Sequence, residues 1–138
     1  MEHGDRIYDA VILNEPYLEW VKRRKKTIET RMRRLNLSGD TIFCCDKGRS
    51  AGSKNAGKAV CMAFVEPCRP MTDEDMEAAC IENVPGRMAF PLSNLRHFSY
   101  DFNFIDYAIT KNWQGVFKLK IPEFVTIFPA GYEHGLAL

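Results

Sequence analysis

The chain has 138 residues, of which 46% are hydrophobic and 27% are charged, with 19 Lys and Arg against 18 Asp and Glu. This length suits a single domain whose core needs no metal or disulfide, and the composition excludes a disordered or fibrous chain. The longest apolar runs are too short to cross a bilayer, so we expect no membrane partner.

Positive charge is concentrated in one half of the chain. Residues 1–69 hold 14 Lys and Arg against 9 Asp and Glu, whereas residues 70–138 hold 5 against 9. Eight of these cations lie within the thirteen residues 22–34. A patch of this kind attracts a polyanion without making the whole protein adhesive, although a solvated helix face is the commoner reason for a run of charge.

A strand, a helix and a second strand are expected at the start of the chain. Residues 8–13 are rich in strand formers, and Pro16 suits the first position of a helix over residues 16–26. The cations at residues 22–26 fall at the end of this helix, where they complement its dipole. From Thr27 the apolar residues alternate with period two, which predicts a strand.

The rest of the chain is expected to alternate between short strands and short helices. The expected elements are strands at residues 41–45, 58–66, 116–121 and 124–128 and helices at residues 72–81 and 101–111. Thr72 and the acidic residues after it are typical of a helix N-terminus. Residues 82–100 are interrupted by two prolines and a glycine, and we expect them to be irregular.

A loop rich in Gly, Ser, Lys and Asn is expected at residues 46–57. The sequence GSKNAGKA at residues 52–59 nearly matches the phosphate-binding loop G-x-x-x-x-G-K-[ST]. However, Ala59 stands where a hydroxyl should hold magnesium, and a strand follows where that motif needs a helix. We therefore expect a flexible basic loop near a polyanion. Its candidate contacts are Arg49, Lys54 and Lys58.

The five cysteines form neither a disulfide framework nor the paired spacing that closes around zinc. No metal and no cofactor are therefore expected. Cys44, Cys45 and Cys61 fall on expected strands, where cysteine is usually a small buried hydrophobe. The odd number of thiols, together with an N-terminus (MEHGDRIYDA) that has no secretory pattern, indicates a reducing compartment, so we expect a cytoplasmic protein.

Residues 24–31, with the sequence RKKTIETR, resemble the G-x-K-T-x-E-x-R motif of the ASCH domain, a small member of the PUA-like superfamily. The matching residues are Lys26, Thr27, Glu29 and Arg31. Arg24 replaces the usual glycine. The order of elements around the motif is similar as well: AVILNEPYLEWVKRRK leads into it, and LSGDTIFCC, GKAVCMAFVEPCRPMTDEDM and WQGVFKLKIPEFVTIFP follow it. The resemblance covers most of residues 8–129.

The resemblance implies one ASCH/PUA-like domain over residues 1–138, with its core at about residues 8–129. It implies an α+β fold with a small, mostly antiparallel PUA-like β-barrel of roughly five or six strands, flanked by two to three helices. A cleft between barrel and helices would be lined by the motif. The order of the elements itself also predicts an α+β domain with mostly antiparallel strands. Closure of the barrel is implied by the resemblance alone.

The expected function is recognition of a nucleic acid, above all RNA or another single strand, or of a modified nucleotide through this cleft. Lys26 can meet a phosphate, and Glu29 can accept a hydrogen bond from an exocyclic amine. Arg31 can orient Glu29 or bind an anion. Bases also stack on aromatic side chains, although each aromatic taken singly is more often a core residue. The candidate ligand-binding residues are Lys26, Thr27, Glu29, Arg31, Arg49, Lys54, Lys58 and Tyr17.

Three other interpretations stay open, and the oligomeric state is open too. One branch of the ASCH family hydrolyses acetylcytidine with the motif lysine and a threonine at the position of Glu29 here. The chain could thus be a nucleoside amidohydrolase or another hydrolase, with Lys26 and Glu29 catalytic and Glu29 activating water. Because the threonine is missing, we expect no hydrolysis of acetylcytidine. Alternatively, Glu29 and Arg31 form a purely structural ion pair, or the chain is a protein-interaction module, which would leave no signature in the sequence.

Overall fold

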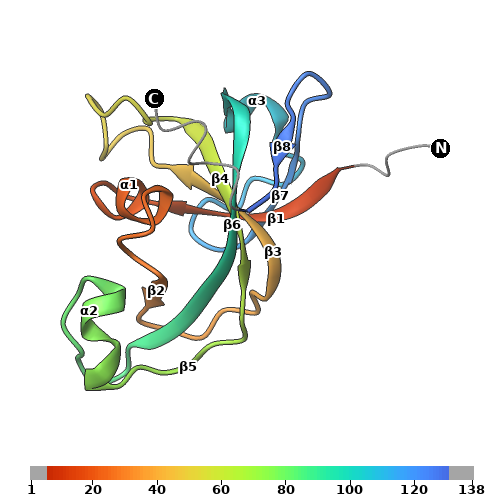
Figure 1. Cartoon of the computed structure of the whole chain (residues 1–138). Helices are drawn as coiled ribbons and strands as arrows, with labels where there is room; N and C mark the ends of the chain where they lie inside the picture. The colour runs from red at the N-terminus through yellow and green to blue at the C-terminus, as the bar shows by residue number, and fades with distance from the viewer. Residues whose placement is uncertain (1–5, 131–138) are drawn as a thin grey trace.

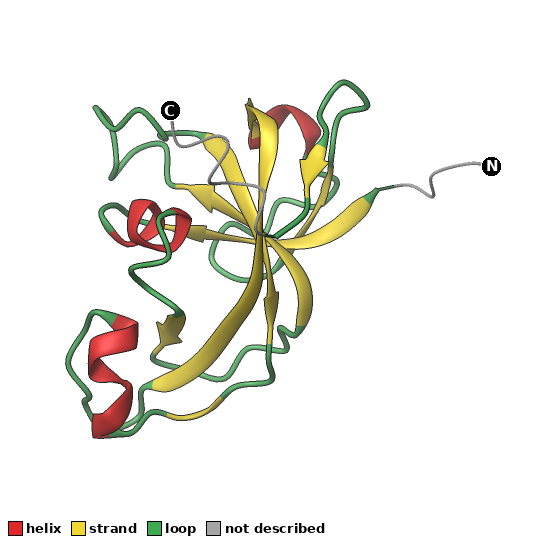
Figure 2. Cartoon of the chain, viewed as in Figure 1, coloured by secondary structure: helices red, strands yellow, loops and turns green. Residues whose placement is uncertain are grey.

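A computed structural model describes residues 6–130 (Figure 1). The strands are β1 (Ile7–Leu13), β2 (Ile28–Arg31), β3 (Gly39–Cys45), β4 (Lys58–Val65), β5 (Arg69–Pro70), β6 (Met88–Asn103), β7 (Phe117–Lys120) and β8 (Ile127–Phe128). The helices are α1 (Tyr17–Lys22), the 3₁₀ turn η1 (Asp73–Asp75), α2 (Met76–Ala79) and α3 (Phe104–Tyr107). Figure 2 shows strands fanning out from the centre of the molecule, with α1 and α2 on one side of it.

These strands belong to one sheet. Its hydrogen-bonded order is β2, β6, β4, β3, β1, β7, and β5 and β8 each pair with β6. The β1–β3 pair is parallel and the other strand pairs are antiparallel. The prediction of an α+β domain with mostly antiparallel strands is therefore confirmed. Within residues 6–130 no pairing joins β2 to β7, so the sheet stays open between these two edges.

The core lies on both faces of the sheet because the central strands are apolar on both faces. In β3, Phe43 belongs to a buried cluster that includes Leu18 and Val21 of α1. Its neighbour Ile42 belongs to a second cluster, which includes Phe117 of β7. Successive residues of a strand point to opposite faces, so the two clusters alternate along β3. The first cluster holds α1 against the sheet and thereby fixes where the chain leaves α1.

The longest strand, β6, occupies a region predicted to be irregular, so the prediction for residues 82–100 is wrong from Met88 onward. Pro91 has no amide proton to donate, but its carbonyl still accepts a hydrogen bond from the amide of Glu66 (3.0 Å). Two register shifts interrupt the ladder with β4, and Asn94 has a left-handed φ of 51°. Such bulges bend and twist a strand. One strand can therefore pair with β2 and β5 near its start and with β8 further along.

The acidic helix predicted at residues 72–81 is present in a shorter form, as η1 followed by α2. Thr72 precedes it as predicted, and the Asp75 carboxylate accepts a hydrogen bond from the Thr72 amide (2.8 Å). Arg69 donates two more hydrogen bonds to this carboxylate, at 2.7 and 2.9 Å. Cys80 follows the last turn with a left-handed φ of 58° and ends the helix.

Candidate functional site

The segment between α1 and β2 carries the motif residues and is shaped by a sharp turn. Arg24 follows α1 with a left-handed φ of 66°, so the helix ends before the predicted residue 26. The amide of Lys26 hydrogen-bonds to the Trp20 carbonyl (3.0 Å), and the amide of Thr27 hydrogen-bonds to the carbonyl of Ala78 in α2 (2.9 Å). The turn thereby places Lys26 between α1 and α2, just before β2.

Lys26, Glu29 and Arg31 form a chain of charged contacts. The Nζ of Lys26 lies 3.7 Å from Glu29 Oε1 and donates a hydrogen bond to the Ala79 carbonyl (2.6 Å). The Nε of Arg31 donates a hydrogen bond to Glu29 Oε2 (2.8 Å), and its Nη2 donates to the Ile12 carbonyl (3.1 Å). Strand alternation places Glu29 and Arg31 on one face of β2. One carboxylate therefore lies between two cations.

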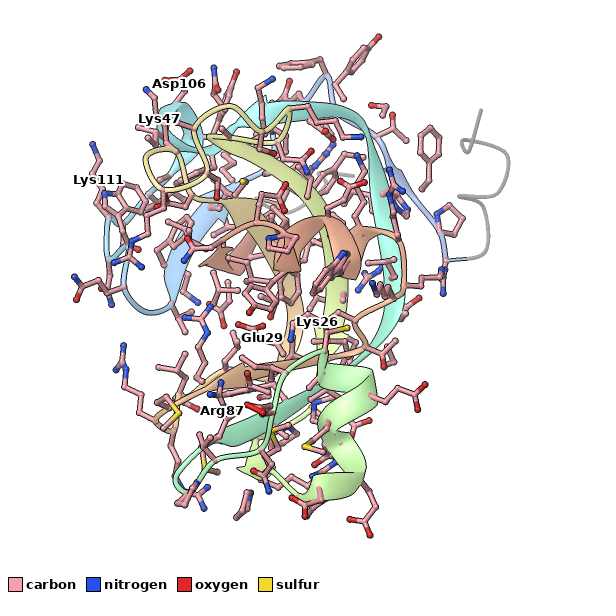
Figure 3. All side chains as sticks on the ribbon, turned by 90° about the vertical axis from the view of Figure 1, so that its left-hand side faces the viewer. Lys26, Glu29, Lys47, Arg87, Asp106 and Lys111 are labelled. Atoms are coloured by element: carbon pink, nitrogen blue, oxygen red, sulfur yellow. The ribbon has the colours of Figure 1, made fainter. Side chains whose placement is uncertain are left out.

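These three side chains line one cavity of about 250 Å³, which we call the acid–base pocket. Lys26 and Glu29 are only 3% and 6% exposed, whereas Arg31 is half-buried. The remaining lining residues are Ile12, Leu13, Asn14, Tyr17, Thr30, Ile81 and Arg87. In Figure 3, Lys26 and Glu29 lie close together just below α1, and Arg87 lies below them, further from α1. The buried motif charges thus face a space that a small group can enter.

The lining of the acid–base pocket carries an excess of positive charge. Three of its side chains are cations and one, Glu29, is a carboxylate, which gives a formal net charge of +2. Burial lowers the pKa of the Lys26 ammonium from its ordinary value, and the Glu29 carboxylate opposes part of this effect. The Lys26 Nζ also lies 5.5 Å from the centre of the Tyr17 ring. The pocket therefore offers donors to an anion or a carbonyl oxygen and an acceptor to an amine.

Arg87 also lines the acid–base pocket, although no sequence pattern predicted it as a site residue. It comes just before β6, and its Nη1 lies 3.4 Å from the hydroxyl of Thr30. Its Nε is shielded from solvent and has no hydrogen-bond partner among the described residues. The pairing of β2 with β6 sets Arg31 opposite Met88 and so brings Arg87 to the pocket. No local motif marks this residue, because its position depends on a contact between distant segments.

Tyr17 and Thr27, two further predicted site residues, are placed differently. Tyr17 lies at the start of α1 and lines the acid–base pocket next to Asn14. Thr27 is exposed and borders a separate hollow of about 70 Å³, which Lys26 and Leu92 also line. The Thr27 carbonyl accepts a hydrogen bond from the Leu92 amide (2.9 Å). Thr27 thus joins β2 to its neighbours through its backbone and does not line the acid–base pocket.

The predicted loop cations are not brought together with the motif. The lining of the acid–base pocket includes none of Arg49, Lys54 and Lys58. The Nζ of Lys54 lies 3.7 Å from the carboxylate of Glu19 in α1. In Figure 3, Lys47 of the same loop lies well away from Lys26 and Glu29. The loop cations can therefore serve only a surface that lies apart from this pocket.

Hydrogen bonds hold the loop at residues 46–57 against the start of α1. Asn55 is 1% exposed, and its Nδ2 donates hydrogen bonds to Glu15 Oε2 (2.7 Å) and Glu19 Oε1 (2.9 Å). The hydroxyl of Ser53 donates a further hydrogen bond to Glu15 Oε2 (2.8 Å). These buried contacts do not fit the flexible loop that the sequence predicts. The composition of the loop is typical of a flexible segment, but its polar side chains form hydrogen bonds that hold it in place.

The cysteines on strands are buried, as predicted. Cys44, Cys45 and Cys61 are fully buried, and burial raises the pKa of the Cys44 and Cys61 thiols. Over residues 6–130, no group of three His, Cys, Asp or Glu side chains is arranged to hold a metal ion. The described part of the chain also has no helix that is long and apolar enough to cross a membrane.

A comparison of the sequence with protein-family models finds no match, and a search of curated proteins finds none either. The features of this chain that bear on its function are therefore the geometry of the acid–base pocket and the motif at residues 24–31.

Proposed function

We propose that this chain recognises a nucleobase, of RNA or of a modified nucleotide, in the acid–base pocket. The observation that carries the proposal is the buried Glu29 carboxylate, which lies between Lys26 and Arg31 on the wall of a cavity. Proteins read a single base by hydrogen bonds to its edge and by stacking on aromatic rings. Glu29 supplies an acceptor for an exocyclic amine, the two cations supply donors for a carbonyl oxygen, and Tyr17 supplies a ring at the pocket wall.

The size of the pocket favours one base over a longer ligand. Pockets for drug-sized molecules usually measure about 300–1,000 Å³. The acid–base pocket, at about 250 Å³, lies just below that range. A base that enters it must leave its stack, as it can in single-stranded or free form. We therefore expect a single-stranded ligand or a mononucleotide rather than a duplex.

The basic run at residues 22–34 gives the proposal a surface for the ligand backbone. Lys25, Arg33 and Arg34 are exposed cations on either side of the pocket residues in the sequence. The Nζ of Lys25 lies 4.3 Å from the centre of the Trp20 ring, so it is held close to an aromatic surface. Such cations attract phosphates without reading sequence.

The proposal includes the fold type that the motif implies. The element order, the mostly antiparallel sheet and the pocket beside the helices fit an ASCH/PUA-like domain. Its barrel would be left open between β2 and β7. In such a domain the motif strand, β2, forms one wall of the ligand site.

Base recognition can be tested by calorimetric titration with the four common ribonucleosides and with acetylcytidine. We expect at least one to bind, and we expect Glu29→Gln or Lys26→Met to weaken it by about tenfold or more, since each removes a charge-assisted hydrogen bond. Glu123→Gln removes the same charge from an exposed position outside the pocket and should leave binding unchanged. Equal affinities for all these proteins would contradict the proposal.

A hydrolase is the second candidate, because one observation favours it. Burial lowers the pKa of Lys26, and its Nζ lies 3.7 Å from a buried carboxylate, an arrangement typical of a paired general acid and base. However, the Glu29 carboxylate already contacts both Arg31 and Lys26. The nearby hydroxyl, that of Thr30, contacts Arg87, so it is not paired with Glu29 as a nucleophile is with its base. We therefore expect no release of acetate from acetylcytidine. Release that disappears in Glu29→Gln would put the hydrolase first.

A further inference from the structure

We propose that the acid–base pocket binds a phosphate monoester together with the base, and that Arg87 is the residue that holds the phosphate. This inference rests on the proposed function, because it names the class of ligand for the same pocket. The ligand is then a nucleoside monophosphate, either free or at the 5′ end of an RNA strand.

Among residues 6–130, the guanidinium of Arg87 has no partner of opposite charge. Its Nη1 lies 3.4 Å from the Thr30 hydroxyl, a long contact with a neutral group. Its Nε has no hydrogen-bond partner within residues 6–130, and no carboxylate there forms an ion pair with Arg87. A buried donor without a partner is costly. An anion that meets the Nε–Nη2 edge of the guanidinium would remove this cost with two parallel hydrogen bonds.

The other cations of the pocket are already engaged. Lys26 contacts Glu29 and the Ala79 carbonyl, and Arg31 contacts Glu29 and the Ile12 carbonyl. Arg87 is therefore the cation of the pocket that is best placed to take a new anionic group. Its role is distinct from that of Glu29, which serves the base edge.

The charge of the pocket selects a phosphate monoester over a diester. The formal net charge of the lining is +2, from three cations and one carboxylate. A phosphate monoester carries about −1.5 to −2 at pH 7, whereas a diester within a strand carries about −1. The monoester therefore comes closest to neutralising the lining.

The surroundings of Arg87 leave room for the movement that binding requires. Nε is shielded from solvent, so an anion reaches it only if the side chain rotates. Arg87 borders a second hollow of about 340 Å³, on the side of Gly86 and Met88. Arg87 therefore lines two cavities, and a rotation of its side chain would present the Nε–Nη2 edge to the acid–base pocket.

The test is calorimetric titration of the whole chain with the four ribonucleosides, their 5′-monophosphates and inorganic phosphate. The variants are Arg87→Gln, Arg87→Lys and the control Arg33→Gln. Arg33 is exposed, donates to the Gln114 carbonyl and lies outside the pocket lining, so its replacement removes the same charge elsewhere. Arg87→Lys keeps the positive charge and the fold but cannot form the bidentate hydrogen bonds of a guanidinium. Circular dichroism establishes that each variant is folded.

We expect a 5′-monophosphate to bind about tenfold or more tightly than its nucleoside. Arg87→Gln should remove this difference between nucleotide and nucleoside, Arg87→Lys should remove most of it, and Arg33→Gln should keep it. The inference is overturned if nucleoside and nucleotide bind equally to the unaltered chain, or if the preference survives in both Arg87 variants.

The same titrations separate this inference from the proposed function. If nucleosides bind through Glu29 and the phosphate adds nothing, this inference alone fails. If inorganic phosphate binds through Arg87 but Glu29→Gln changes no affinity, base recognition fails and the phosphate site stands. A tetranucleotide with and without a 5′-phosphate shows whether the phosphate comes from an RNA end or from a free nucleotide. If the 5′-phosphate strengthens binding of the tetranucleotide as much as it strengthens binding of the nucleoside, the site is assigned to RNA ends. A smaller effect on the tetranucleotide assigns the site to free nucleotides.

Discussion

Glu29 is the residue on which the other charges of the acid–base pocket depend. It contacts both Lys26 and Arg31 and is almost fully buried. Removing one partner of a buried ion pair costs about 3–5 kcal/mol when the other is left uncompensated. Without Glu29, two cations face each other with no counter-charge. Without Lys26, the Glu29 carboxylate still has Arg31.

We therefore predict that Glu29→Gln lowers the free energy of unfolding by about 3 kcal/mol and Lys26→Met by only about 1 kcal/mol. Urea unfolding followed by circular dichroism measures both. The exposed control Glu123→Gln should change stability by less than about 0.5 kcal/mol. A loss in Lys26→Met as large as that in Glu29→Gln would mean that Lys26, and not Glu29, organises the charges.

The sequence could place only part of this residue set. Period-two alternation predicts that Glu29 and Arg31 share a face, and they do contact each other. Arg87 has no such signal, because the pairing of β2 with β6 brings it to the pocket. Thr27 matches the motif by letter, yet its side chain borders a different hollow. A motif therefore indicates a neighbourhood, and tertiary contacts decide which side chains line it.

At the scale of elements, the short helix beside the pocket depends on Asp75. Hydrogen bonds from Arg69, then from the Thr72 amide, hold the pKa of the Asp75 carboxyl well below its usual range. A carboxyl with a lowered folded-state pKa contributes stability above its unfolded pKa, near 4, and this contribution is lost as the pH falls toward the folded pKa. The helix also carries the Ala79 carbonyl that binds Lys26.

We predict that Asp75→Asn destabilises the protein at pH 7 by about 1–2 kcal/mol, since it weakens a capping box and an ion pair. Because the unaltered protein loses the Asp75 contribution in acid, the difference between the two should narrow at pH 3. Urea unfolding at both pH values measures it. A difference that stays constant or grows in acid would show that Asp75 does not stabilise through its charge.

The contact between β2 and β6 also belongs to the element scale. Phe90 is fully buried and lies opposite Glu29 in this pair. We predict that Phe90→Ala lowers the free energy of unfolding by about 3–5 kcal/mol and weakens ligand binding, because β2 loses its support. Phe124→Ala, at a site that is 60% exposed, should cost far less. If ligand binding is unchanged in a folded Phe90→Ala protein, the packing of Phe90 in β6 is not needed to hold β2 in the site.

Sequence patterns predicted most elements but not the longest one. Residues 88–103 form one strand although Pro91 lies within it, because its carbonyl still pairs and bulges absorb the misfit. The loop at residues 46–57 is composed like a flexible segment, yet Asn55 fastens it to carboxylates far away in the sequence. Both errors have one cause: long-range hydrogen bonds override local composition.

At the scale of the whole molecule, charge is segregated between the halves of the chain, and this predicts a salt-sensitive association. We predict that the chain binds single-stranded RNA weakly, and that affinity falls on the order of tenfold between 50 and 200 mM salt, as for about three neutralised phosphates. Labelled oligonucleotides measure it. Lys25→Gln should reduce the slope with salt, while Lys120→Gln, on the exposed face of β7, should not. An RNA affinity that does not change with salt concentration would mean that the basic run at residues 22–34 does not contact the ligand.

Amide chemical shifts of the ¹⁵N-labelled protein show whether the ligand enters the acid–base pocket. A short single-stranded RNA is added, and the shifted amides are mapped onto the fold. We predict that the largest shifts fall at residues 26–31, at Asn14 and at Arg87, and that Glu29→Gln removes them. Shifts confined to the loop at residues 46–57, with the amides of residues 26–31 unchanged, would mean that the ligand does not enter this pocket.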